Sequence, residues 1–412
     1  MFPLVAQAQA LEQLIASALS SHPSAQVQRA LTASAQAGVD SARWQYYPTP
    51  SVAIESAHAS ASDSAYQGDG VVSTLRLQQP IWTGGRLTAG MNKAEAGVIA
   101  SQASLEEIRQ QLALRVVQSY GDWLSAHLKI LAYEQSMATH VRLRDQVKRR
   151  IEQGASADSD LILAVSRMQS IAADISVARA QKDIALARLG QLLGRPIDDA
   201  ALNTTSNAVF AAPRPVNSGL PKLLDLALAV NPTIHKAQAQ AKVQESVIAE
   251  RRADLSPEVY LRAERQYGNY SVSNSGPENR LFIGLNSRFG AGLSSLSNVE
   301  GAKSQHQAAL AEVEAQSRTV SEQVLADYAL ATSSESRLDA LNASLEAAGQ
   351  VSKSYDRQFL AGRKTWLDVM NAARELAQTE LQLADIKSTQ VVVTWRLAIY
   401  TQGIAAVVEG GQ

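Results

Sequence analysis

The feature that most limits the fold of this chain is a very long stretch without helix breakers. Residues 86–153 contain no proline and almost no glycine. Because these two residues interrupt helices, the stretch predicts one continuous helix, which at about 1.5 Å per residue would be roughly 100 Å long. No compact domain of this size needs a helix of that length. Residues 293–357 repeat the pattern, so we expect long helices rather than a thick globular core.

The composition agrees with long helices and excludes several classes of function. Aromatic residues make up only 5% of the chain, and alanine, serine, glutamine and leucine dominate. The 38 basic and 39 acidic residues are dispersed and leave a net charge of −1, which argues against a nucleic-acid-binding surface. The absence of cysteine excludes disulfides, thiolate metal sites and a cysteine nucleophile, and we also expect no lipid on an N-terminal cysteine.

The chain also contains two similar halves. His22-Pro23 is answered by Asn231-Pro232 at an offset of 209 positions (232 − 23), and Ile151–Asp160 is answered by Phe359–Asp368 at an offset of 208 (368 − 160). Two separate anchors at nearly one offset indicate internal duplication. We therefore expect a first repeat at residues 1–195, a connector at 196–219 and a second repeat at 220–412.

Each half is predicted to contain a helix, two strands, a very long helix, a glycine turn and a further helix. In the first half these elements are Gln9–Trp44, Val52–His58, Val71–Gln79, Arg86–Gln153 and Ala157–Leu193. In the second half they are Lys222–Asp254, Val259–Tyr267, Leu281–Phe289, Leu293–Arg357 and Thr365–Thr401. Apolar residues at steps of three and four between Leu161 and Leu193 predict a coiled-coil seam. The two shorter helices of a half together match the long one and could pair along it.

The strands carry the pattern of a membrane β-barrel. Val259, Leu261 and Ala263 alternate with polar residues, although an edge strand of a soluble sheet would look similar. No 18 consecutive apolar residues occur, so we expect strands rather than a helix to cross any membrane. Four strands cannot close around a channel, and lipid does not tolerate open sheet edges. Three copies would give twelve strands, enough for a barrel with a lumen.

These elements resemble the TolC-like family of outer-membrane efflux proteins from Leu11 to Gly403. The most specific matches are the turn Phe359–Val369, with its first-half counterpart Ile151–Asp160, and Gln79-Pro80-Ile81-Trp82 before the long helix. The resemblance implies a homotrimer with a small β-barrel in the outer membrane and an α-helical barrel, or tunnel, in the periplasm. It also implies two partners, a periplasmic adaptor (membrane-fusion protein) and an inner-membrane ABC transporter or proton-driven pump.

The same resemblance assigns roles to residues of the two turns. Asp368 matches an aspartate that rings the closed pore, Lys364 matches a frequent arginine, and Asp160 matches an acid that can pair with it. The chain departs from the family at Asn371, where a second pore aspartate can occur, and at Phe359, which replaces a frequent tyrosine. The residues expected to face the adaptor are Gly154, Ala155, Gly362 and Arg363. Helix capping around a terminal glycine explains the same pattern, and both interpretations can hold together.

Motifs of catalysis are missing from the sequence. The six histidines show no metal-binding spacing, Gly290-Ala291-Gly292 does not complete a dinucleotide fingerprint, and no phosphate-binding loop occurs. We therefore predict no cofactor, no metal and no enzyme activity. Trp82 is expected at a membrane interface or, equally, in ordinary packing.

The predicted function is a passive exit duct whose energy comes from an inner-membrane partner. The expected lack of a lipid anchor favours type I protein secretion, and the alternative is the outer-membrane component of a multidrug efflux pump. A soluble coiled-coil scaffold or adaptor is the rival from another class. Residues 1–10 are either the remnant of a signal peptide or an ordinary N-terminus.

Overall fold

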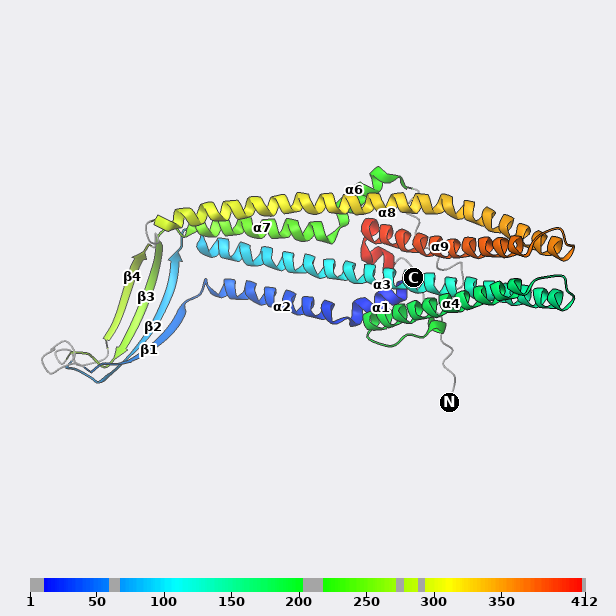
Figure 1. Cartoon of the computed structure of the whole chain (residues 1–412). Coiled ribbons are helices and arrows are strands. Elements are labelled where there is room, and N and C mark those ends of the chain that lie inside the picture. The colour runs from blue at the N-terminus through cyan, green and yellow to red at the C-terminus, as the bar shows by residue number, and fades with distance from the viewer. Residues whose placement is uncertain (1–10, 59–66, 203–217, 272–277, 288–292, 410–412) are drawn as a thin grey trace. The chain divides into compact units, whose positions relative to one another are not determined.

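The computed structural model of this chain describes residues 11–58, 67–202, 218–271, 278–287 and 293–409. It is predominantly helical and contains one four-stranded antiparallel sheet, as predicted (Figure 1). The helices are α1 (Leu11–Ser21), α2 (Pro23–Trp44), α3 (Arg86–Glu152), α4 (Asp158–Leu193), η2 (Asp199–Ala201), α6 (Leu220–Val230), α7 (Pro232–Ala253), α8 (Ser294–Leu360) and α9 (Trp366–Glu409). The strands are β1 (Thr49–Ser56), β2 (Val71–Trp82), β3 (Glu258–Tyr267) and β4 (Glu278–Asn286). The interpretations of residues 1–10 concern a segment outside the described residues.

The two long helices are confirmed, since α3 and α8 each contain 67 residues without interruption. The two helices predicted at Gln9–Trp44 and Lys222–Asp254 were wrong in one respect, because each is broken in two. The breaks fall at His22-Pro23 and Asn231-Pro232, where Asn231 has extended backbone angles (φ −67°, ψ 122°). Proline lacks an N–H and forces the preceding residue out of the helical region, so a new helix begins at the proline itself.

The sheet follows the order β1-β2-β3-β4, with all neighbours antiparallel. The strands differ at their ends from the prediction: β1 lies three residues earlier at its start, β2 continues to Trp82, and β4 spans Glu278–Asn286. Pro80 lies inside β2 beyond the last residue that pairs with β1, and the register with β3 shifts between Pro80 and Trp82. Proline has no N–H group to donate a hydrogen bond to a neighbouring strand. It is tolerated here because the position pairs with one strand only and lies at an irregularity of that pairing.

The chain forms two compact units, and each draws on both predicted repeats. One unit contains residues 1–26, 107–231 and 318–412, and the other contains residues 27–106 and 232–317. The second unit holds the sheet, and there the ion pair between Lys93 Nζ and Glu250 Oε2 (2.9 Å) links α3 to α7. The division of the chain into residues 1–195, 196–219 and 220–412 remains a prediction.

The first unit has a core formed by α1, α3, α4 and α9, in which Trp123 is fully buried. Helix α3 approaches α9 closely at Gly121, where a Cβ atom would lie 2.1 Å from Cγ2 of Val392. Ser388 Oγ donates to the carbonyl oxygen of Gly121 at 2.7 Å. A larger residue at 121 would therefore separate the two helices.

An ion pair between a buried carboxylate and a partly exposed arginine joins α8 to α9 in the same unit. Arg396 Nε lies 3.1 Å from Asp327 Oδ2, and the side chain of Asp327 is only 2% exposed. Burial raises the pKa of Asp327 to about 6, although the charge of Arg396 acts in the opposite direction. The removal of this carboxylate from water therefore raises its pKa more than the charge of Arg396 lowers it.

Helices α4 and α9 contain 18-residue stretches that are apolar enough to cross a membrane by length and composition alone. The requirement for 18 consecutive apolar residues overlooked both. The α9 stretch is 61% buried, as expected of a core helix, whereas the α4 stretch is 11% buried. Ion pairs of Arg179 with Glu134 and of Arg188 with Asp122 hold α4 against α3, so α4 is one member of a helix pair (Figure 1).

Candidate functional site

The two turns that follow the long helices have the same geometry. Gly154 (φ +70°) and Gly362 (φ +72°) adopt the left-handed conformation that favours glycine. Behind each glycine, two backbone hydrogen bonds close the helix end: Gly154 and Ala155 donate to residues 151 and 150, and Gly362 and Arg363 donate to residues 359 and 358. This is the Schellman motif, so the capping role expected for both glycines is confirmed.

After the second turn, Thr365 and Asp368 cap the start of α9. Asp368 Oδ2 accepts hydrogen bonds from the backbone N–H of Thr365 (3.0 Å) and from its hydroxyl (2.8 Å), and Thr365 Oγ1 accepts from the N–H of Asp368 (3.2 Å). This reciprocal arrangement is a capping box. The hydrogen bonds from Thr365, and then the charge of Lys364, hold the pKa of Asp368 below its ordinary value. Asp368 is therefore ionised at neutral pH.

The first turn lacks this cap. The residue before α4 is Ala157, whose side chain cannot accept a hydrogen bond, and Asp160 occupies the position equivalent to Asp368. The backbone N–H of Asp160 donates to the carbonyl of Ala157 at 3.0 Å. The two turns therefore share their glycine geometry but differ in how the next helix begins.

A small apolar core holds the two turns together, and Phe359 belongs to it. Phe359 and Trp366 are both 4% exposed and their ring centroids lie 5.4 Å apart. The other buried members are Leu143, Val147, Ala164, Val369, Met370 and Ala373, which come from α3, α4 and α9. Since a phenol oxygen at this depth would need a hydrogen-bond partner, phenylalanine suits a position that packs rather than bonds.

Sequence reasoning missed Arg150, which connects the first turn to the second. Its guanidinium carbon lies 4.6 Å from the centroid of the Phe359 ring. Its Nη1 donates to the carbonyl oxygen of Phe359 at 3.2 Å, and its Nη2 to that of Ala155 at 3.5 Å. The signal was the basic run 148–150 at the end of α3, where cations favour a helix C-terminus, but only the folded chain shows the partners.

Within one chain the predicted pair Asp160–Lys364 does not form an ion pair. Lys364 Nζ instead lies 4.2 Å from the centroid of the Tyr355 ring, a cation–π contact. Asn371 and Arg363 are exposed, as are Gly154, Ala155 and Gly362. The structure thus brings the predicted residues to the same pair of turns, with Gly154 and Gly362 on the surface.

The start of the connector is fixed to the first unit by Asp199. Its Oδ1 accepts from Trp123 Nε1 (2.7 Å) and its Oδ2 from Lys182 Nζ (2.8 Å). Although burial favours the neutral acid, the hydrogen bonds from Lys182 and Trp123 hold the pKa of Asp199 below its ordinary value. Burial also lowers the pKa of the neighbouring His127, against the charge of Asp199.

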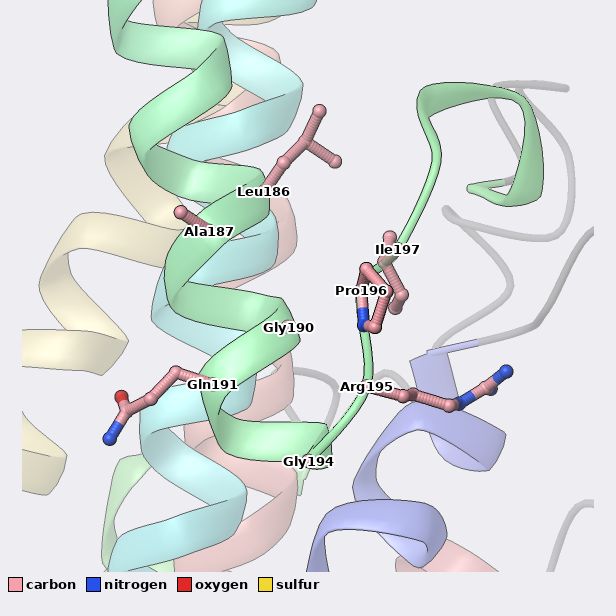
Figure 2. A pocket seen from close by; sticks show the side chains of 8 residues that line it. All are labelled: Leu186, Ala187, Gly190, Gln191, Gly194, Arg195, Pro196 and Ile197. Carbon is pink, nitrogen blue, oxygen red and sulfur yellow. The ribbon is translucent and has the colours of Figure 1, made fainter.

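Figure 2 shows a surface pocket of about 480 Å³ where the chain turns back beside the end of α4. Pro196 and Ile197 lie across from Gly190, and Arg195 is the one charged residue in its lining. The described residues contain no group of three or more histidine or acidic side chains that could hold a metal ion. The pocket offers no pair of groups for acid–base or nucleophilic chemistry.

The two faces of the sheet differ sharply in chemistry. On one face, Leu281, Ile283 and Leu285 of β4 are 71%, 82% and 69% exposed, and they pair with Ala263, Leu261 and Val259 of β3. Alternation places the charged residues of these two strands, apart from Arg265, on the other face. A sheet with one strongly exposed apolar face needs a non-aqueous environment on that side.

The opposite face carries a network of charges. Glu264 lies 2.6 Å from Arg76 Nε and 3.1 Å from Arg262 Nε. Arg262 in turn lies over the ring of Phe282, 4.5 Å from its centroid. The predicted alternation of apolar and polar faces is therefore confirmed.

Aromatic side chains mark both ends of the apolar face. Trp82, the last residue of β2, is 50% exposed at the end next to the helices, and Tyr267, the last residue of β3, is 48% exposed at the loop end. Between Val259, which pairs with Trp82, and Tyr267 there are eight residue steps, or about 27 Å along the strand. This is close to the apolar height of an outer-membrane sheet, about 25 Å.

The sequence matches the family of outer membrane efflux proteins over residues 14–195 and 223–398. The chain belongs to this family. The resemblance noted from the two turns is thereby confirmed, as are the outer-membrane location and the placement of the helical part in the periplasm. Its family and relatives are transport channels rather than enzymes.

Two curated relatives and one solved structure illustrate the relationship. The alkaline protease secretion protein AprF of Pseudomonas aeruginosa is 26% identical over 347 residues, which cover 81% of this chain and 69% of AprF. The outer membrane protein TolC of Vibrio cholerae is 25% identical over 314 residues, which cover 74% of this chain and 71% of TolC. The structure of VceC from Vibrio cholerae has a TM-score of 0.81 at 16% identity, covering 95% of this chain and 96% of VceC, and this likeness concerns the fold.

Proposed function

We propose that this efflux-family protein is the exit duct of a type I secretion system. Three copies would share one twelve-stranded barrel in the outer membrane and one helical tunnel in the periplasm. The observation that carries the proposal is the exposed apolar face of the sheet, which lipid would cover. The same face argues against a soluble coiled-coil scaffold, because water would contact Leu281, Ile283 and Leu285.

The choice of secretion over drug efflux rests on a relative. AprF is named for the secretion of a protease and is 26% identical to this chain. A periplasmic adaptor and an inner-membrane ABC transporter would then be the partners. Deleting the gene should remove a secreted protein from the medium and leave drug sensitivity unchanged. The opposite pattern, drug sensitivity with normal secretion, would favour the alternative of a multidrug efflux pump.

The first prediction concerns assembly. In the part of the chain that the structure describes, the sheet has two open edges, β1 and β4, and an edge exposed to lipid leaves backbone groups without partners. The protein purified in detergent should therefore have three times the 44.1 kDa mass of one chain. Native mass spectrometry checks this, and a stable monomer or dimer would contradict the shared barrel.

We further propose that the turns form the periplasmic gate. In a trimer, three copies of Asp368 would ring the pore, and Asp160 would pair with Lys364 of a neighbouring protomer rather than within one chain. An exposed ion pair contributes only about 0.2–1 kcal/mol, so the closed state would depend on three copies acting together. Carboxylates around a narrow passage attract cations.

The second prediction follows from this gate. Lys364→Glu should raise single-channel conductance in planar bilayers, because the cation of the proposed pair becomes an anion. Asp368→Ala should weaken the preference for cations. Thr365→Ala is the matched control, since it breaks the same capping box without changing charge. If Asp368→Ala and the control Thr365→Ala had the same ion selectivity, the proposed gate at these turns would be contradicted, whereas the proposed duct would not.

A further inference from the structure

The apolar face of the sheet contains one charged side chain whose position needs an explanation. Arg265 of β3 is exposed and pairs in register with Leu75 of β2. It therefore lies on the same face as Ala263 and Leu281, the pair two residues along. That this face contacts lipid rests on the proposed function above.

Arg265 lies near the outer surface of the membrane. The helices adjoin the sheet at one end, and β1 and β3 end at the other end (Figure 1). Because the helical part lies in the periplasm, this second end of the sheet faces the cell exterior. Arg265 is two residues from the exterior end of β3, so its guanidinium is at the depth of lipid headgroups rather than of acyl chains.

No carboxylate of the described residues forms an ion pair with Arg265. Its guanidinium carbon lies 5.0 Å from the centroid of the Tyr267 ring, which orients it but leaves its donors available. The adjacent acid, Glu264, is on the opposite face and is held there by Arg76 and Arg262. A cation at a lipid boundary without a protein counter-ion favours an anion from the lipid itself.

Directly beside Arg265, the apolar face is hollowed. A shallow depression of about 370 Å³ is lined by Leu75, Leu77, Ala263 and Leu281 and, toward the exterior end, by Glu264, Arg265, Asn279 and Arg280. The small side chain of Ala263 lies between Leu77 and Leu281 in one row across three strands, which leaves the space between the two leucines open. Its apolar lining and polar exterior edge match a lipid tail below a headgroup.

We infer that Arg265 and this depression form a binding site for a phosphorylated glycolipid of the outer leaflet. The guanidinium of Arg265 donates to a phosphate oxygen, a pairing that its planar set of N–H groups favours. Asn279 supplies a further polar group beside the phosphate. One acyl chain lies over Ala263, between Leu77 and Leu281.

Lipid binding to the full-length protein in nanodiscs tests this site. The probes are lipid A with its two phosphates, the same lipid after the phosphates are removed, and inorganic phosphate alone. The wild type should bind phosphorylated lipid A about tenfold more tightly than the dephosphorylated form, as a charge-assisted contact in a boundary environment implies. Arg265→Gln should abolish this preference. Ala263→Phe, which fills the depression, should weaken binding of both lipids and preserve the preference.

The matched control is Arg76→Gln, which removes the same charge from the opposite face of the sheet at a neighbouring row. It should bind both lipids like the wild type. The site is overturned if Arg265→Gln keeps the preference, if Arg76→Gln loses it equally, or if inorganic phosphate alone displaces the lipid. The conductance of the same purified proteins is recorded in planar bilayers. A protein that conducts but shows no lipid preference refutes this site alone, whereas a protein that fails to insert refutes the proposed duct.

Discussion

Replacing Arg396 with glutamine should destabilise the protein strongly at pH 8 and only slightly at pH 5. In the wild type, the folded-state pKa of Asp327 is about 6 against an ordinary value of 3.8, so the native protein holds an extra proton between these values. The contribution of this carboxyl to stability is therefore complete below about pH 4 and is lost as the pH rises through 6. A shift of this size corresponds to about 3 kcal/mol.

Removing Arg396 takes away the one counter-ion that the structure places within 4 Å of Asp327 among the described residues. At pH 8 the carboxylate must then be buried as an unpaired charge or take up a proton. We expect a loss of about 2–3 kcal/mol in the free energy of unfolding, somewhat less than for a fully buried pair because Arg396 is one-third exposed. At pH 5 Asp327 is mostly protonated and the loss should be under about 1 kcal/mol.

Guanidinium unfolding in detergent at pH 5 and pH 8 measures the effect. The double variant Asp327→Asn/Arg396→Gln is the control, since it leaves a neutral pair of similar shape. It should recover most of the stability lost at pH 8 and show a flatter pH dependence than the wild type. A single variant that loses the same stability at both pH values would show that packing, rather than charge, connects α8 to α9 at this point.

A tryptophan at Gly362 should abolish export while the protein still inserts and conducts. A Cβ atom at this glycine would meet no other atom within 4 Å, so a large side chain projects outward from the turn. The left-handed backbone costs an L-residue about 1–2 kcal/mol, which an assembly of long helices tolerates. The indole would then occupy the surface that we propose for the adaptor, and Gly154→Trp should act in the same way.

Two control variants separate the effect of side-chain size from that of backbone strain and from that of position in the chain. Gly362→Ala carries the same backbone penalty without the indole and should export normally. Gly194→Trp introduces the indole at another left-handed glycine (φ +70°) with open surroundings, at the opposite end of α4, and should also export. Secreted protein in the medium and channel conductance in bilayers are the two measurements. Normal export by Gly362→Trp would contradict the proposal that this turn contacts the adaptor.

Local sequence patterns predicted most of the fold. The two long helices follow from the absence of proline, and the tip turns follow from glycines that end a helical pattern. The breaks before Pro23 and Pro232 were not predicted, although each proline lacks the N–H group that a continuous helix needs at that position.

What sequence could not predict is the set of contacts between elements distant in the chain. Arg150 is separated from Phe359 by more than 200 residues, and a basic run at a helix end does not indicate which ring it contacts. The same limit applies to Asp327 and Arg396, two opposite charges on different helices. The pairing of Asp160 with Lys364 was inferred from the family resemblance, and one chain alone does not form it.

The two unpaired edges of the sheet also bear on how the protein reaches its membrane. Within the described residues of a single chain, neither β1 nor β4 has a partner beyond it, so a lone protomer would carry unbonded peptide groups into hydrocarbon. Insertion and assembly therefore cannot be consecutive, independent events in the proposed trimer. The rate at which finished channels accumulate should depend on encounters between newly made chains, and a slowly expressed protein would spend longer as an exported but uninserted intermediate.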